Sequence, residues 1–208
     1  MLTNSCLVEA RPFAVPLARE WSELESRVAN ATVFQSCAWC SAWLQASANV
    51  GLVEETRLLT VKRNGRLALL WPLAVRWAGP CRVLHALGEP ATQYCDALIA
   101  ADEDRNQLLQ IAWSAIRSWH DIDLLEMRRV RADAAISALP ALTGAAAANA
   151  TAAPFVDMKL AGGDTHRSSR TRNALKRHRR KLAEHGHVAF EVVEDVAAKI
   201  RVVDEAVA

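Results

Sequence analysis

The chain has 208 residues, of which 51% are hydrophobic and 23% charged, so it can bury a substantial core and wholesale disorder is excluded. A net charge of +2 argues against a protein built as a whole to bind polyanions. The longest apolar run, residues 67–75, spans only about half of a bilayer core as a helix, so no membrane span is expected. The N-terminus lacks an apolar signal segment, which predicts a cytoplasmic protein with reduced cysteines.

The first third of the chain predicts one strand and two helices. Residues 6–10 are expected to form a short strand. Residues 17–30 form an amphipathic helix in which Trp21, Leu24 and Val28 share the buried face. Ser36 is a good N-cap residue, so a second helix is expected from there to about residue 48.

A β-hairpin follows. Asn64-Gly65 is the strongest short turn signal, because a type I′ turn needs positive φ at both central residues. It predicts paired strands over residues 56–63 and 66–77. Pro72 interrupts the second strand and lacks an N–H, so we expect a sheet edge or a bulge at that point.

The middle of the chain continues the mixture of strands and helices. Residues 81–87 and 94–99 predict strands. Residues 102–119 predict a helix capped by Asp102, and residues 122–127 another strand. Residues 132–153 are rich in alanine but contain Pro140 and Gly144, which predicts a short helix followed by a linker.

The texture changes in the last quarter. Residues 155–160 and 187–193 read as strands, 165–185 as a long basic helix ended by Gly186, and 194–207 as another helix. Residues 166–208 hold ten Lys/Arg against six Asp/Glu, whereas the rest of the chain is slightly acidic. In the basic helix, Thr171, Leu175, His178 and Leu182 form a narrow stripe expected to face a core.

The order of elements predicts an α/β (α+β) fold with a mixed, largely antiparallel sheet flanked by helices. We expect one domain over residues 1–153 and the incomplete beginning of a second over residues 154–208.

Three stretches together resemble one protein family. They are Phe34-Gln35-Ser36-Cys37-Ala38-Trp39 with Trp43; Gly65-Arg66-Leu67, Trp71-Pro72-Leu73, Leu87-Gly88 and Tyr94-Cys95-Asp96; and Ser168-Ser169-Arg170-Thr171-Arg172 with Leu175, Arg179-Arg180-Lys181-Leu182, Gly186 and Phe190. The chain resembles acyltransferases of the GNAT superfamily, specifically the CelD/BcsL type associated with bacterial cellulose biosynthesis, which is similar to the tandem-GNAT FemABX proteins.

The resemblance implies two GNAT-like halves and transfer of an acyl group from acetyl-CoA or another acyl-CoA to a small-molecule amine, such as an envelope or polysaccharide precursor. In this family the acyl-CoA site lies in the second half, so we expect it outside this chain. The basic helix would then form a wall of the acceptor or phosphate site through Arg170, Arg172 or Lys176. No catalytic or cofactor-binding residue is assigned.

Tyr94 and Asp96 lie at the end of a predicted strand, where sites often gather, and are the remaining candidates for substrate binding. Asp96 could orient an amine or cap a loop, and of the two roles we favour capping. The segment from Arg76 to Cys81 contains Gly79, but Pro80 removes an N–H, so a phosphate loop is not expected there.

Other patterns have simpler interpretations. Cys37 and Cys40 form a C-x-x-C that we interpret as reduced, partly buried cysteines, with a redox pair as the alternative. The six histidines do not cluster at ligand spacing, so no metal is expected. The basic helix is a solvated face or an anion-binding module, although it lacks aromatic residues for base stacking and no nucleic acid is expected. A non-catalytic recognition fragment is the other alternative to an enzyme.

Overall fold

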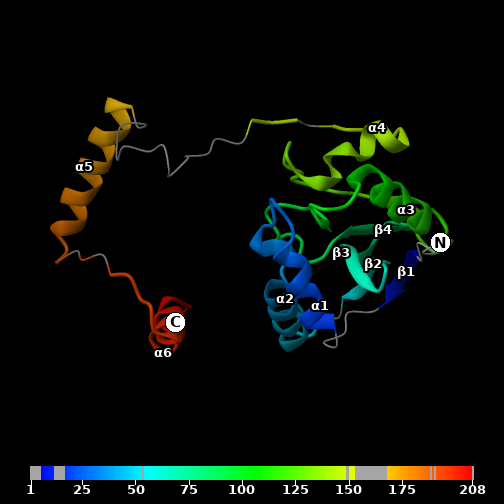
Figure 1. The fold of residues 1–208 in the computed structure, drawn as a ribbon. Helices are drawn as coiled ribbons and strands as arrows, with labels where there is room; N and C mark the ends of the chain where they lie inside the picture. The colour runs from blue at the N-terminus through cyan, green and yellow to red at the C-terminus, as the bar shows by residue number, and fades with distance from the viewer. Residues whose placement is uncertain are drawn as a thin grey trace. The chain divides into compact units, whose positions relative to one another are not determined.

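The computed structural model describes residues 6–11, 17–52, 54–148, 150–152, 168–187, 189 and 191–207. The chain divides into two units, Met1–Asn149 and Ala150–Ala208, which are taken one at a time here (Figure 1). The assignment of residues 1–153 and 154–208 to two GNAT-like domains stays a prediction.

Unit 1 is built on a six-stranded sheet in the order β1-β2-β3-β4-β6, with β5 also paired to β3. Every pair is antiparallel except β4 and β6, which run parallel. The predicted mixed, largely antiparallel α/β fold is therefore confirmed. The strands are β1 (Cys6–Arg11), β2 (Glu55–Arg63), β3 (Arg66–Ala78), β4 (Cys81–Ala86), β5 (Leu98–Ile99) and β6 (Leu124–Leu125).

The predicted hairpin joins β2 to β3. Asn64 has φ 50° and Gly65 has φ 78°, which is the pair of positive values that a type I′ turn requires. The register shifts once between Val61 and Lys62, where Ala68 is the additional residue on β3. After this bulge, the side chains of β3 alternate strictly between the two faces of the sheet.

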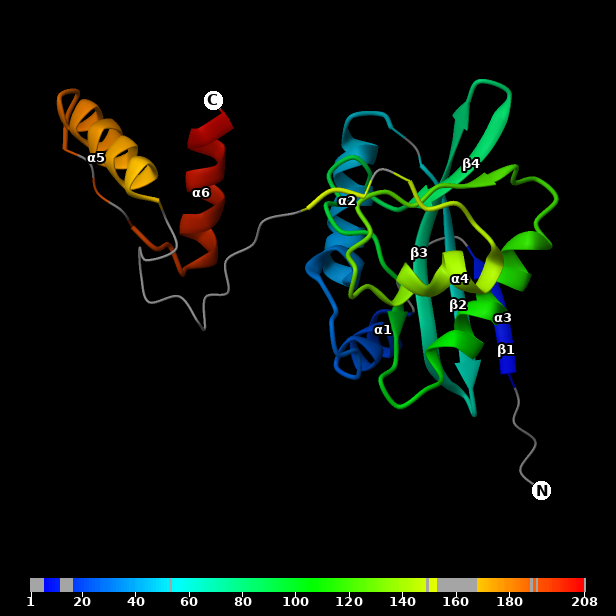
Figure 2. The same ribbon diagram turned by 90° about the horizontal axis from the view of Figure 1, so that it is seen from above.

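Helices cover both faces of the sheet (Figure 2). On one face, Leu69, Trp71 and Leu73 pack in a cluster with α3 (Arg105–Arg117) and the short helices η3 (Ala135–Ala138) and α4 (Leu139–Thr143). On the other face, Leu70 and Ala74 pack with α1 (Ala18–Glu25) and α2 (Cys37–Asn49), while η2 (Val33–Gln35) lies between these two helices in the chain. Trp71 is fully buried, and no hydrogen-bond acceptor for its indole N–H is present among the described residues.

Pro72 lies in the central strand, so the prediction of an edge or a bulge at that residue was wrong. The carbonyl of Pro72 accepts a hydrogen bond from Leu87 N at 3.1 Å, on the side of β4. In a strand, the nitrogen of a residue points to the same side as its carbonyl. On that side of β3, β5 pairs with Leu69 and Leu70, and the pairing with β4 starts only at Leu73. The nitrogen of Pro72, which has no hydrogen to donate, therefore faces the gap between the two partner strands.

The helix caps partly follow the sequence. Ser36 caps α2 as predicted, and its hydroxyl accepts from Trp39 N at 3.1 Å. Asp102 does not cap α3, contrary to expectation. The helix begins at Arg105, so Asp104 is its N-cap and accepts from Gln107 N at 3.0 Å, whereas Asp102 lies in the preceding turn and pairs with Arg27 at 2.8 Å. Two predicted strands, residues 94–99 and 122–127, shorten to two residues each.

Unit 2 contains α5 (Ser169–Ala183) and α6 (Val196–Val207), close to the two predicted helices. The predicted strand over residues 155–160 lies outside the described residues. Residues 187, 189 and 191–193 form no strand, because no neighbouring strand exists among the described residues of this unit to complete a ladder. None of the helices that the structure describes has the length and apolar content needed to cross a bilayer.

Gly88 sits in the tight turn after β4 with φ +87°, where an added Cβ would lie 2.6 Å from Thr92 Oγ1 and 3.3 Å from Trp39 Nε1. Thr92 Oγ1 also donates to Leu87 O at 2.8 Å, so it is not free to move away.

We predict that Gly88→Ala lowers the free energy of unfolding by about 3 kcal/mol, which combines left-handed backbone strain with overpacking. Gly65→Ala is the matched control, because its φ is +78° but an added Cβ meets nothing within 4 Å. The control should cost only about 1 kcal/mol in urea unfolding. Equal losses in the two variants would show that the contact with Thr92 is unimportant.

Candidate functional site

The parallel strands β4 and β6 separate soon after they meet. Asp123 N donates to Arg82 O and Glu126 N to Leu84 O, both at 2.9 Å. Beyond these bonds, Ala86 O accepts from Glu89 N and Arg129 O accepts from Cys95 N, both at 3.4 Å. The loop over residues 87–97 therefore enters the space between the two strands, and the following helix α3 makes the crossover from one strand to the other.

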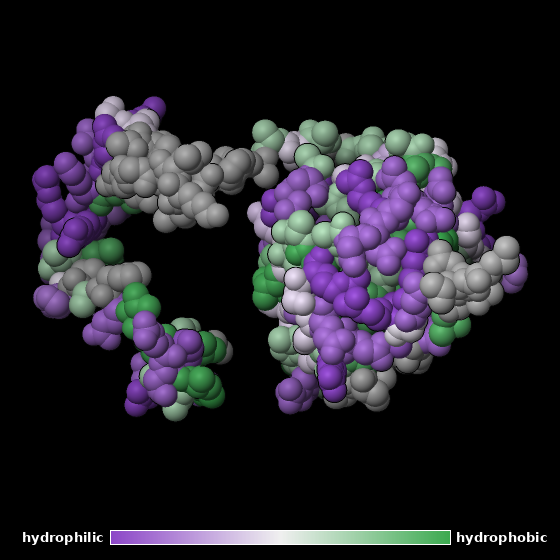
Figure 3. Space-filling model, viewed as in Figure 1, coloured by the Kyte–Doolittle hydropathy of each residue, from purple (hydrophilic) through white to green (hydrophobic). Residues whose placement is uncertain are grey.

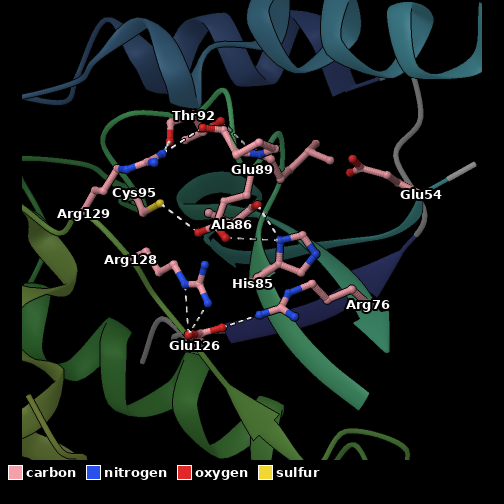
Figure 4. Close-up of polar contacts among 12 residues, drawn as sticks. Glu54, Arg76, His85, Ala86, Glu89, Thr92, Cys95, Glu126, Arg128 and Arg129 are labelled. Atoms are coloured by element: carbon pink, nitrogen blue, oxygen red, sulfur yellow. Dashed lines mark hydrogen bonds and ion pairs between the residues drawn. The ribbon is translucent and has the colours of Figure 1, made fainter. Parts of the chain in front are cut away.

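A group of ionisable side chains lies at this split (Figure 4). We call His85, Glu89 and Cys95 the split cluster. His85 is only 5% exposed, and its Nδ1 lies 3.0 Å from Ala86 O and 4.0 Å from Glu89 Oε2. Since a carbonyl oxygen can only accept, Nδ1 carries the proton in this contact. Cys95 Sγ donates to the other carboxylate oxygen, Glu89 Oε1, at 3.6 Å.

Burial controls the protonation of the split cluster. It lowers the pKa of His85 despite the nearby carboxylate of Glu89, so the imidazole is predominantly neutral. It also raises the pKa of the Cys95 thiol to about 12, and the charge of Glu89 acts in the same direction. Cys95 is therefore a protonated, unreactive thiol rather than a nucleophile. His85 retains a free Nε2 that suits a proton acceptor.

Arginines fix the segments around the split cluster. Arg129 adopts φ 53° and donates from Nη1 to Pro90 O at 2.8 Å and to Thr92 O at 3.1 Å. Glu126 binds Arg76 and Arg128, and these charges lower the pKa of its carboxyl group against the opposing effect of burial. The two hydrogen bonds from Arg129 connect the loop over residues 87–97 to the segment after β6.

Tyr94 borders a shallow surface hollow whose enclosed part has room for about one water molecule. The Tyr94 ring is 40% exposed, its centroid lies 5.9 Å from that of Phe34, and Arg131 stacks at 5.5 Å. Arg131 also forms a two-pronged pair with Asp133 at 2.8 and 2.7 Å. The hollow thus combines an aromatic surface with a carboxylate and a guanidinium. Its lining comes from residues 30, 32, 94–96, 131, 133 and 134.

Asp96 lies at the inner edge of this hollow, where its carboxylate accepts three backbone N–H groups. The donors are Ala97 at 2.8 Å, Ala135 at 2.9 Å and Ile136 at 3.0 Å. Burial raises the pKa of Asp96, and the three donors oppose that rise. The carboxylate therefore caps the start of η3, the structural alternative considered from the sequence. A contact with substrate stays a prediction.

The five predicted substrate-binding residues fall in two units. Tyr94 and Asp96 meet at the hollow of unit 1. Arg170, Arg172 and Lys176 lie on α5 in unit 2, on an exposed helix without buried residues, so the stripe expected to face a core is not buried.

Sequence reasoning missed the split cluster. A histidine inside the apolar run Val83-Leu84-His85-Ala86-Leu87, with Glu89 four residues later, was the available signal. The histidines were weighed only by metal-ligand spacing, and that test cannot detect a buried imidazole with a carboxylate partner.

The cysteines and acidic groups offer no metal or disulfide site among the described residues. Cys37, Cys40, Cys81 and Cys95 are free thiols, and no described group of three His, Cys, Asp or Glu could hold a metal. Cys40 is buried, which raises its pKa to about 12. Cys37 is half-buried and Cys40 buried, in agreement with the interpretation of the C-x-x-C as packed thiols.

The start of α3 is occupied by carboxylates. Asp104 caps the helix, Glu103 pairs with Arg63 at 3.2 Å, and Asp102 pairs with Arg27. Helix N-termini attract anions, but here the positive end already has an anionic cap and two acidic neighbours. This terminus is therefore poorly suited to a pyrophosphate. The other glycine segment considered, Arg76 to Cys81, is the tight connection from β3 to β4.

No model of a protein family and no curated protein sequence matches this chain. Solved structures with a similar arrangement include a possible acetyltransferase from Clostridium difficile 630, with 8% identity, TM-score 0.46 and coverage of 73% of this chain and 99% of that one. A ribosomal-protein-alanine N-acetyltransferase from Brucella melitensis biovar Abortus 2308 has 14% sequence identity and a TM-score of 0.42, and the match covers 71% of this chain and 99% of that one. An aminoglycoside N-acetyltransferase in complex with CoA has 7% sequence identity and a TM-score of 0.38, and the match covers 94% of this chain and 97% of that one. These TM-scores are below 0.5, so the superpositions assign neither family nor activity.

The lowered pKa of His85 predicts a pH-dependent contribution to stability. The unfolded chain takes up a proton at His85 below pH about 6.5, whereas the folded chain resists it, so the contribution is present above that pH and is lost as the pH falls. We expect the stability difference between wild type and His85→Gln to shrink between pH about 7.5 and about 5.5 in urea titrations. A difference that grows on acidification would mean that His85 is protonated in the fold.

Asp96→Ala is predicted to lower the free energy of unfolding by about 2–3 kcal/mol, because it leaves backbone N–H groups without an acceptor. Asp133→Ala provides the control, since it removes a carboxylate from the same hollow that is paired only with exposed Arg131. It should change stability by less than about 1 kcal/mol. Similar losses for the two variants in thermal and urea unfolding would rule out the capping role.

Proposed function

We propose that this chain is an N-acyltransferase of the GNAT type, in which unit 1 recognises the amine acceptor and acyl-CoA binds outside unit 1. The main support for the proposal is the way in which the sheet ends, at β4 and β6. An otherwise antiparallel sheet finishes in a parallel pair, β4 and β6, which is joined by the crossover helix α3 and separates after two residues of pairing. The sequence resemblance to the CelD/BcsL type independently favours the same reaction.

In the proposed reaction, the amine nitrogen attacks the thioester carbonyl, a C–N bond forms, the C–S bond breaks, and CoA leaves as the thiol. The amine must lose a proton, and the oxyanion of the intermediate needs hydrogen-bond donors. Unit 1 contributes acceptor recognition at the Tyr94 hollow. The Arg131–Asp133 pair, beside the partly exposed side chain of Tyr94, would offer hydrogen-bonding groups of both charges to a sugar or another small amine.

The acidic start of α3 supports placing acyl-CoA elsewhere. A pyrophosphate at this terminus would meet Asp104, Glu103 and Asp102, two of which already hold arginines. Like charges disfavour such binding. The finer assignment, an amino sugar or another envelope or polysaccharide precursor as acceptor in the cytoplasm, rests on the resemblance alone.

The proposal is tested by incubating the full chain with acetyl-CoA and a panel of primary amines that includes glucosamine, and by detecting N-acetyl products by mass spectrometry. We expect a product whose formation falls at least about tenfold in Tyr94→Ala, a loss of about 1.4 kcal/mol of transition-state binding, while the fold is retained. His120→Ala is the control, because it changes an exposed residue remote in sequence from the hollow.

Calorimetric titration with acetyl-CoA separates the remaining outcomes. A folded chain that binds the amines but forms no product would be a recognition module rather than an enzyme. Saturable acetyl-CoA binding that Asp104→Arg strengthens would contradict the placement of acyl-CoA outside unit 1. A chain that neither binds nor acetylates any of the amines would overturn the proposed function.

A further inference from the structure

Helix α5 carries an unusually uniform charge. Its fifteen residues, Ser169–Ala183, contain no Asp or Glu. The cations are Arg170, Arg172, Lys176, Arg177, Arg179, Arg180 and Lys181. They make this helix the strongest concentration of positive charge in the chain. In Figure 3 the surface of α5 is largely purple, the colour of hydrophilic residues.

The same helix has an apolar stripe on one side. Thr171, Leu175, His178 and Leu182 recur at helical spacing, and Leu175 and Leu182 are 45% and 60% exposed. At about 100° per residue, Lys181 and Arg170 border this side along one margin and Arg179 and Arg172 along the other. The stripe is therefore flanked by cations on both sides.

The second helix of the unit repeats the pattern of exposed apolar residues. Val196, Ile200 and Val203 recur at i, i+4 and i+7 on α6, and they are 69%, 58% and 61% exposed. Asp195 caps this helix by accepting from Ala198 N at 2.8 Å, so the helix begins at a defined point.

Most of the cations of α5 are not neutralised within the described part of the chain. No described carboxylate lies within ion-pair distance of Lys176, Arg179, Arg180 or Lys181. A partner that covers the stripe must therefore be apolar at its centre and anionic at its margins.

We propose that α5 binds the surface of an anionic lipid bilayer. Leu175 and Leu182 would enter the boundary between headgroups and acyl chains, while the flanking cations contact lipid phosphates. A nucleic acid would use the cations but not the stripe, and α5 has no aromatic side chain on which a base could stack. The apolar stripe thus favours lipid over nucleic acid. This inference is independent of the proposed acyl transfer.

The test is co-sedimentation of the full chain with vesicles of phosphatidylcholine containing one third phosphatidylglycerol, compared with pure phosphatidylcholine. We expect binding to the anionic vesicles only, weakened by raising NaCl from about 0.1 M to about 0.5 M. Arg179→Glu/Lys181→Glu should weaken it by at least about thirtyfold, because these two cations border the stripe on opposite sides. Arg105→Glu/Arg117→Glu makes the same charge change on α3 and should have little effect.

Leu175→Gln/Leu182→Gln separates lipid from other polyanions, because it keeps all seven cations and a helix-forming side chain. It should weaken vesicle binding by at least about tenfold and leave any binding to poly-U RNA unchanged. Circular dichroism checks that the variants keep their helix content. Equal binding to both kinds of vesicle, no vesicle binding, or binding that ignores the leucines would each overturn the proposal.

Discussion

The strand β3 is the constraint on which unit 1 depends. It is hydrogen-bonded along both edges, to β2 on one side and to β5 and then β4 on the other. It is also covered on both faces, because Leu69 and Trp71 pack under α3 while Leu70 and Ala74 pack under α1 and α2. A strand fixed in four directions leaves little freedom for register, so the other elements take their positions from it.

The change of partner beside β3 creates the candidate site. β4 turns away from the gap at Pro72 and runs parallel to β6, and the two strands then part around the loop over residues 87–97. Buried groups line this split because the loop supplies partners for them: Glu89 meets both His85 and Cys95. The hollow beside Tyr94 opens from the same loop, and Cys95 belongs both to its lining and to the split cluster.

Most of the fold could be predicted from short sequence patterns. The candidate site could not, because it depends on contacts between residues that are far apart in the sequence. Asn64-Gly65 and Ser36 specify a turn and a cap through their own backbone and side-chain chemistry, and both predictions were confirmed. The cap of α3 was misassigned because the helix begins at Arg105 rather than at Asp102, which lies in the preceding turn and binds Arg27. Pro72 was misjudged because the strands that flank it are paired non-locally. Tyr94 and Asp96 stay predicted substrate-binding residues, and the backbone groups that make Asp96 a cap lie about forty residues away in the sequence.

The indole of Trp71 has a spectroscopic consequence. Trp71 is fully buried in the core, and its indole N–H has no acceptor among the described residues, so neither solvent nor such a hydrogen bond relaxes its excited state. Its emission should therefore lie at the short-wavelength end of the range for proteins, well separated from that of Trp77, which is 66% exposed. The centre of β3 thus contains its own optical reporter, which responds when water first reaches the middle of the sheet.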